Sequence, residues 1–131
     1  MSPFVLPITT IYAAANISIL IMLAFLVVHH RISNQISLGG GGIDPLERAI
    51  RAHGNLAEHA PSALILLAIM ELNGFAAWQL HFLGGAFSLA RISHLHGILT
   101  ATQLTRSMGA LFSVILMTSM IGLLMIRLVM D

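Results

Sequence analysis

The chain has 131 residues, of which 57% are hydrophobic and 8% charged, and its mean hydropathy is +0.92. A soluble domain carries about 25% charged residues, so this composition predicts an integral membrane protein. The net charge of +1 gives no sign of the basic surface that binds nucleic acid. The absence of cysteine excludes disulfides, thiolate metal sites and a protein thiol nucleophile. Because each span needs roughly 20 apolar residues, residues 1–131 fit a single domain with four membrane-spanning helices.

The first predicted helix covers residues 4–29, an apolar run that two histidines and Arg31 end at a membrane interface. The run is too long for a signal peptide and lacks a basic start and a small-residue cleavage site, so we expect a retained transmembrane helix. The polar connection that follows contains four successive glycines, Gly39 to Gly42, which permit almost any backbone path.

The second predicted helix covers residues 45–73. Asp44 is a favourable N-cap, Pro45 suits the first helical position, and an Asn-Gly pair provides a typical stop. About 29 residues make a helix of roughly 43 Å, which exceeds the ~30 Å hydrocarbon core. Its polar first half must therefore project from the bilayer or line a wet crevice, and Pro61 is expected to bend the helix near that boundary.

The third predicted helix covers residues 76–99 and the fourth covers residues 106–130. A tight turn around Gly74 precedes the third helix, and a short polar link separates it from the fourth. All of the arginines except Arg127 lie in or beside the first and third connections. This bias predicts that the two polar connections are cytoplasmic and that both termini lie outside.

A polar stripe runs along the second predicted helix. Its members step by three, four and three residues, so they share one helical face. They are Arg48, Arg51, Asn55 and Glu58. Charged groups at membrane depth are costly and usually face a partner, a cavity or a ligand, so the stripe predicts a functional site.

The predicted topology brings further polar residues into the same layer. Arg91 and His94 lie three residues apart near the end of the third helix. Arg106 and Ser107 lie at the start of the fourth, where free backbone N–H groups and the helix dipole favour an anion. Together with the stripe, these groups suit a small zwitterion that carries two carboxylates and a thiol.

Two simpler interpretations stay open. Arg91 and Glu58 could form one buried ion pair between the third and second helices, although the stripe contains more polar groups than one bridge needs. Seven histidines raise the question of a metal site. No metal is expected, because His94 and His96 lie on different helical faces and the HxxEH zinc pattern is absent.

The run ERAIRAHGNLAE over residues 47–58, with Pro61 after it, resembles the second-helix signature of the MAPEG family. That family comprises membrane-associated proteins of eicosanoid and glutathione metabolism. The resemblance spans the chain in helix count and order and is closest to the small bacterial branch. It continues more weakly at Glu71, Gly74, Gly84, Phe87, Arg91 and His94.

The resemblance implies an all-α, four-helix subunit of a homotrimer in the bacterial inner membrane, in contact with lipids, with glutathione bound between subunits from the cytoplasmic side. It implies a glutathione-dependent transferase or peroxidase that acts on lipophilic small molecules. Arg106 would stabilise the glutathione thiolate, with Ser107 as a hydrogen-bond donor. Glutathione would be held by Arg31, Arg48, Arg51, Asn55, Glu58, Arg91 and His94.

Several positions depart from the eicosanoid enzymes of the family, among them Gly54, where several of those enzymes have arginine. Ile98 stands where they have a tyrosine, and Ala110 and Leu111 stand where they have aromatic or hydroxyl groups. These departures weaken the case for eicosanoid chemistry and leave glutathione binding as the expectation. They also keep a second function open, namely a non-catalytic membrane scaffold or regulatory protein with a lipid- or glutathione-binding groove. A transporter is disfavoured, because no inverted repeat or broken helix is recognisable.

Overall fold

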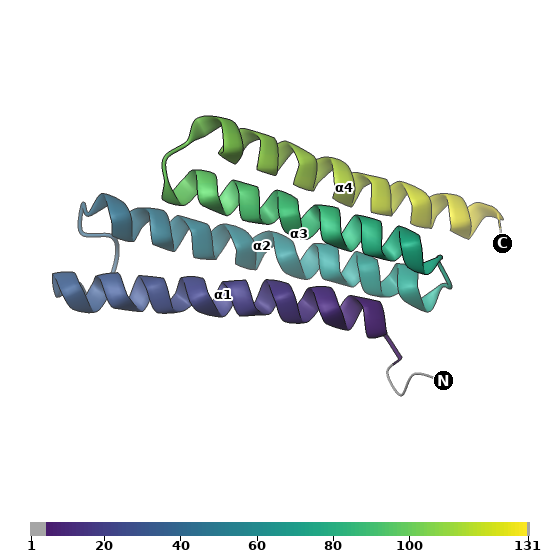
Figure 1. The fold of residues 1–131 in the computed structure, drawn as a ribbon, viewed down its shortest axis with the longest axis horizontal. Coiled ribbons are helices and arrows are strands. Elements are labelled where there is room, and N and C mark those ends of the chain that lie inside the picture. Colours follow the sequence, from purple (N-terminus) through teal and green to yellow (C-terminus); the bar gives the residue numbers. More distant parts are fainter. Residues whose placement is uncertain (1–4, 131) are drawn as a thin grey trace.

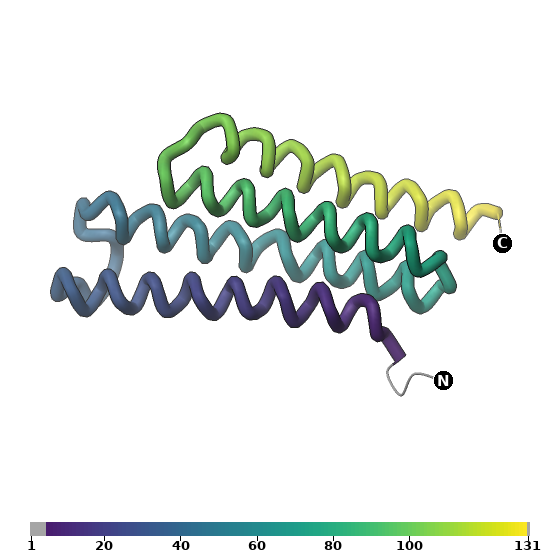
Figure 2. Tube along the Cα trace, in the orientation of Figure 1, coloured from purple at the N-terminus to yellow at the C-terminus, as the bar shows by residue number. Residues whose placement is uncertain are grey.

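The computed structural model describes residues 5–130. They form α1 (Pro7–Asn34), α2 (Asp44–Leu72), α3 (Ala77–Leu99) and α4 (Gln103–Met130). Neighbouring helices run antiparallel in one bundle (Figure 1), and the tube view shows α2 and α3 between α1 and α4 (Figure 2). The α1–α2 and α3–α4 connections lie at one end of the bundle, whereas α1 begins and α4 ends at the other. The prediction of an all-α four-helix bundle is confirmed.

Two helices are longer than predicted at the end that carries these connections. α1 continues past Arg31 to Asn34 and stops where Gln35 takes a left-handed conformation with φ of 57°. The backbone N–H of Gln35 donates to the carbonyl oxygen of Ile32 and closes the last turn. α4 begins at Gln103, ahead of the predicted start at Arg106. The predicted helix ends were placed where the apolar run meets polar residues. A helix can continue through polar residues wherever water or another group forms hydrogen bonds with their side chains.

The turn between α2 and α3 forms at the predicted place. Gly74 has a φ of 71°, a conformation that favours glycine, and the N–H of Phe75 donates to the carbonyl oxygen of Met70 at 3.2 Å. This bond satisfies a carbonyl that the helix end would otherwise leave without a partner. α2 itself runs through Pro61 without interruption.

The core consists of two apolar clusters, one toward each end of the bundle. The first contains Leu23, Ala52, Leu56, Ala60 and Leu95, which join α1, α2 and α3. The second contains Leu67, Met70, Leu80, Leu83 and Met120, which join α2, α3 and α4. Both clusters contain residues from the inward face of α2. This packing fixes the rotation of α2 about its axis, so the polar stripe in its first half faces away from the apolar core.

Two glycines let α3 and α4 approach closely near the connection between these two helices. A Cβ atom on Gly97 would lie 2.6 Å from the Cα of Arg106, and one on Gly109 would lie 2.6 Å from the carbonyl oxygen of Ala90. Both distances are shorter than any real carbon contact. The small residues therefore set the distance between the end of α3 and the start of α4.

Polar contacts also join the helices at the other end of the bundle. The carboxylate of Glu71, at the end of α2, accepts the backbone N–H groups of Ile8 and Thr9 at 2.8 and 2.7 Å. These groups belong to the first turn of α1, which has no partner of its own for them. The hydroxyl of Tyr12 donates to the carbonyl oxygen of His81 at 3.0 Å and so ties α1 to α3.

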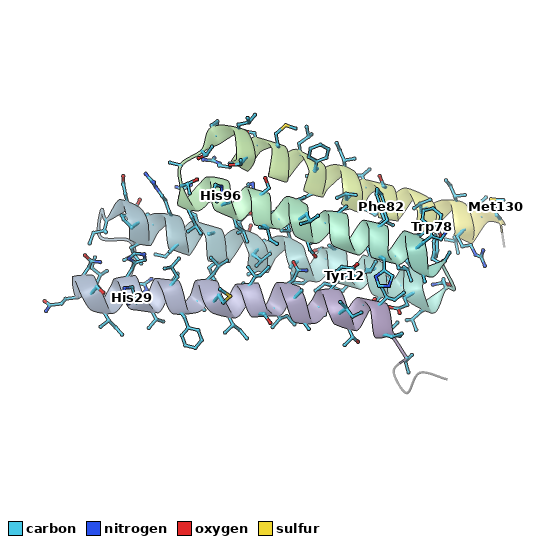
Figure 3. The ribbon with its side chains drawn as sticks, viewed as in Figure 1. Tyr12, His29, Trp78, Phe82, His96 and Met130 are labelled. Carbon is cyan, nitrogen blue, oxygen red and sulfur yellow. The ribbon has the colours of Figure 1, made fainter. Side chains whose placement is uncertain are left out.

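The outer faces of α1 and α4 are apolar and exposed. Both helices are long and apolar enough to cross a membrane. Within residues 5–130 they make no contact with each other, so each packs on the bundle from one side only. Figure 3 shows His29 and His96 toward the end with the two connections and Trp78 toward the opposite end. Phe25, Ile126 and Leu128 are among the large side chains left exposed, as expected for surfaces that face lipid or another subunit.

Candidate functional site

A polar cleft of about 500 Å³ lies between α2, the end of α3 and the start of α4. The α3–α4 connection stops short of the ends of α1 and α2, so the first turns of α2 extend past it (Figure 1). The polar half of α2 lines this cleft, which is one of the two arrangements that its length and composition predicted. The volume falls within the range of about 300–1,000 Å³ that is usual for small-molecule sites.

The whole predicted stripe of α2 lines this cleft, in the order Arg48, Arg51, Asn55 and Glu58. Arg48 forms an ion pair with Asp44 one turn earlier, at 3.6 Å. Among residues 5–130, Arg51 and Glu58 are exposed and form no ion pair with another side chain of the chain. These two charges are therefore available to a bound molecule.

His94 of α3 and Arg106 of α4 form the opposite wall of the cleft. The Nδ1 atom of His94 lies 2.7 Å from the backbone carbonyl oxygen of Arg106. His94 is buried, whereas the Arg106 side chain is exposed and has no carboxylate partner within the described residues. The histidine thus fixes the backbone that carries the arginine and leaves the guanidinium group free in the cleft.

Arg91 lies outside the lining of the cleft, in contrast to the role that the sequence suggested. Its side chain is 1% exposed and lies at the interface of three helices. It donates hydrogen bonds to the Oδ1 atom of Asn55 on α2 and to the Oγ atom of Ser113 on α4, the second at 3.3 Å. The alternative ion pair with Glu58 is not formed, because Glu58 is exposed in the cleft.

Two further predicted residues, Arg31 and Ser107, are not part of the cleft lining. The Nη1 atom of Arg31 donates to the carbonyl oxygen of Ser37 in the first connection at 3.1 Å. Ser107 is exposed, and its hydroxyl accepts a hydrogen bond from Gln103 at 3.1 Å. Within a single subunit, neither side chain lines the cleft.

Sequence reasoning missed three residues that shape the site. Gln103 lines the cleft at the start of α4, Gly97 lets that start approach α3, and Ser113 accepts the bond from Arg91. Gly109 and Ser113 are small residues four apart, a spacing typical of close helix packing. That spacing signals the helix contact but not the hydrogen bond to Arg91.

The cleft carries an excess of positive charge. Three arginines, at positions 48, 51 and 106, face one carboxylate, that of Glu58. Planar guanidinium groups bind carboxylates through paired hydrogen bonds, and a carboxylate binds an ammonium group. The described residues contain no group of three side chains suited to a metal ion. The arrangement suits a small organic molecule with more than one negative group and one positive group.

These features define a class of protein: a four-helix membrane bundle with a polar cleft at one end. The MAPEG family profile matches residues 9–126, so the chain belongs to the MAPEG family. It is similar to the inner membrane protein YecN of Escherichia coli strain K12, with 34% identity over 90 residues, which is 69% of each chain. YecN of Escherichia coli O6:H1 matches to the same extent. No solved structure matches significantly.

The comparisons and the fold agree on where the protein belongs in the cell. Both relatives are named as inner membrane proteins, and α1 and α4 are long and apolar enough to span a bilayer. The chain is therefore an integral protein of a bacterial inner membrane. The names of these relatives state no activity, and the cleft is the part of the molecule that indicates its chemistry.

Proposed function

We propose that the protein binds glutathione in the cleft and uses it as a co-substrate against lipophilic electrophiles or hydroperoxides. The observation that carries this proposal is the grouping of Arg51, Arg106 and Glu58, all without ion-pair partners among the described residues, in one cleft. Glutathione has two carboxylates, one ammonium group and a thiol. Arg48 and Arg51 suit its carboxylates, and Glu58 suits its ammonium group. Family membership supports the same assignment.

Arg106 is the residue that we assign to thiol activation. A free thiol has a pKa of ~8.5 and is mostly protonated at neutral pH. A guanidinium group beside the sulfur, together with the positive end of the α4 dipole, lowers that pKa and increases the thiolate fraction. The Nε2 atom of His94, the ring nitrogen that is not bonded to the Arg106 carbonyl, is available to accept the thiol proton. The thiolate then attacks the electrophilic carbon, a C–S bond forms, and the leaving group departs with its electron pair.

The proposal includes a homotrimer with glutathione between subunits and with both polar connections in the cytoplasm. Support comes from the exposed apolar faces of α1 and α4 and from the position of both connections at one end (Figure 1). Arg31 would then contact the ligand of a neighbouring subunit. Chemical crosslinking in native membranes tests the assembly: trimers are expected, and a ladder that ends at the monomer or dimer argues against it.

One observation favours a non-catalytic second candidate. Ile98, which replaces the tyrosine of the eicosanoid enzymes, lines the cleft, so that part of the wall offers no hydroxyl group. A scaffold or regulatory protein would keep the cleft and bind glutathione or a lipid without activating a thiol. Binding without thiolate formation would favour this candidate.

Isothermal titration of the purified protein with glutathione and with S-methylglutathione tests the proposal. Both compounds carry the same charges, so both should bind if the charged groups of the cleft recognise them. An absence of binding by both compounds overturns the proposed function and leaves the fold unaffected. Binding of both, with conjugation of a test electrophile by glutathione, supports the enzyme.

A further inference from the structure

Arg91 is a buried cation without a carboxylate partner. Its Nε atom has no hydrogen-bond partner, and its side chain is 1% exposed. Both of its hydrogen bonds go to neutral oxygen atoms, on Asn55 and Ser113. Burying a charge without a counter-charge costs free energy of folding. An apolar side chain could fill the same space without that cost, so packing alone does not explain an arginine here.

The chemistry of arginine fixes the orientation of the Asn55 amide. A guanidinium group only donates hydrogen bonds, so the Asn55 atom that faces Arg91 must be the carbonyl oxygen. The two N–H bonds of the same amide then point away from Arg91. Asn55 lines the cleft, so these N–H groups are the ones that a ligand can use.

Ser113 supplies the second fixed point of Arg91. Its hydroxyl donates to the carbonyl oxygen of Gly109 at 2.7 Å, which leaves a lone pair to accept the Nη1 hydrogen of Arg91 at 3.3 Å. Gly109 lies at the close α3–α4 contact. The position of Arg91 therefore depends on the packing of α4, and the Asn55 amide depends on Arg91.

We propose that Arg91 is a positioning residue, anchored by Ser113, that sets the Asn55 amide so that it donates to a carboxylate or carbonyl oxygen of the ligand. This inference rests on the proposed binding of glutathione. Arg91 does not touch the ligand and acts through Asn55. The chain thereby turns asparagine, which can donate or accept, into a dedicated donor.

The variant Asn55→Asp separates this role from a structural one. Aspartate accepts from Arg91 at least as well as asparagine and supplies the missing counter-charge, but it cannot donate into the cleft. Asn55→Ala removes both functions. Gln35→Glu makes the same change from amide to carboxylate on an exposed residue outside the cleft and is the matched control.

Thermal unfolding without ligand tests the contact with Arg91, and titration with glutathione tests the donor. Asn55→Asp should melt at or above the wild-type temperature, whereas Asn55→Ala should melt below it. Glutathione binding should weaken about 10- to 100-fold in Asn55→Asp, as for the loss of a hydrogen bond to a charged group, and about threefold or less in Gln35→Glu. Glutathione diethyl ester, with both carboxylates neutral, should bind Asn55→Asp and wild type with a smaller difference.

Each contrary outcome has a distinct meaning. If Asn55→Asp melts as low as Asn55→Ala, Arg91 does not position the amide, and the inference fails whatever binds. If Asn55→Asp is stable and binds glutathione as tightly as wild type, the donor role fails. If wild-type protein binds no glutathione, the proposed function fails and the ligand-directed half of the inference fails with it, while the melting temperatures still decide the contact with Arg91.

Discussion

The Nδ1 atom of His94 lies 2.7 Å from the backbone carbonyl oxygen of Arg106, so one hydrogen bond joins the end of α3 to the start of α4. A carbonyl oxygen only accepts, so Nδ1 must carry the hydrogen. In the neutral ring the other nitrogen, Nε2, then carries no hydrogen and can accept one, and His94 lines the cleft. A single side chain thus combines a structural bond with a chemical group at the proposed site.

The variant His94→Asn should separate these two roles. The side-chain amide nitrogen of asparagine lies close to the position of Nδ1, so the bond to the Arg106 carbonyl should survive and the melting temperature should stay near wild type. The loss of Nε2 should slow glutathione conjugation about 100-fold, the lower range for a proton acceptor. Stopped-flow conjugation kinetics measure the effect. His81→Asn at the far end of the bundle is the control, and a wild-type rate in His94→Asn would exclude Nε2 from the reaction.

The close contact between α3 and α4 gives a prediction about stability. In Gly97→Ala the added methyl group would overlap the backbone of Arg106, so α4 must move. The free energy of unfolding should therefore fall by about 1–3 kcal/mol. Binding should weaken as well, because the cleft changes shape. Gly122→Ala on the same helix bundle meets nothing within 4 Å and should be neutral or stabilising. Thermal unfolding in detergent compares the two, and equal melting temperatures would contradict the close contact.

The proposed role of Arg106 predicts a pH dependence. If Arg106 lowers the thiol pKa, the rate of conjugation by wild-type protein should rise with pH and level off below pH ~8.5. In Arg106→Ala the thiol keeps its ordinary pKa, so the profile should shift to higher pH and the rate at neutral pH should fall. Arg106→Lys should recover part of the shift, and Arg127→Ala serves as a control at the opposite end. Superimposable profiles for wild type and Arg106→Ala would remove Arg106 from thiol activation.

Glu71 provides a test of the far end of the bundle. Glu71→Gln keeps one acceptor oxygen, so one of the backbone N–H groups of Ile8 and Thr9 loses its partner. The free energy of unfolding should fall by about 1–3 kcal/mol, the cost of an unsatisfied partly buried donor. Glutathione affinity should not change, since the cleft lies at the other end. A loss of affinity without a loss of stability would contradict this separation.

Part of the cleft was predictable from the sequence because one helix, α2, supplies its polar stripe and more of its lining than any other element. The spacing of Arg48, Arg51, Asn55 and Glu58 places them on one face of any continuous helix, and α2 is continuous. The orientation of Arg91 was not predictable. Its burial depends on how closely α4 approaches α3 at Gly109, which is a property of packing between helices.

The exact helix ends and the hydrogen-bond partners of nearby side chains could not be predicted from the sequence either. Ser107 was expected in the cleft because the fourth helix was predicted to start beside it, but α4 starts earlier, and Gln103, one turn before, donates to its hydroxyl. Arg31 was expected to reach the ligand of a neighbouring subunit, and that stays a prediction; within its own chain α1 continues past it, and its side chain donates to the first connection. In both cases a short-range hydrogen bond within the chain decides the position of the side chain.

The central claim, that this cleft binds glutathione and activates its thiol, is tested most directly by rapid mixing of the purified protein with glutathione while thiolate absorbance is recorded at neutral pH. We predict an increase in thiolate absorbance that saturates with glutathione concentration and that Arg106→Ala abolishes without loss of binding. The absence of any saturable thiolate signal in wild-type protein would contradict the account of Arg106 as the activating residue.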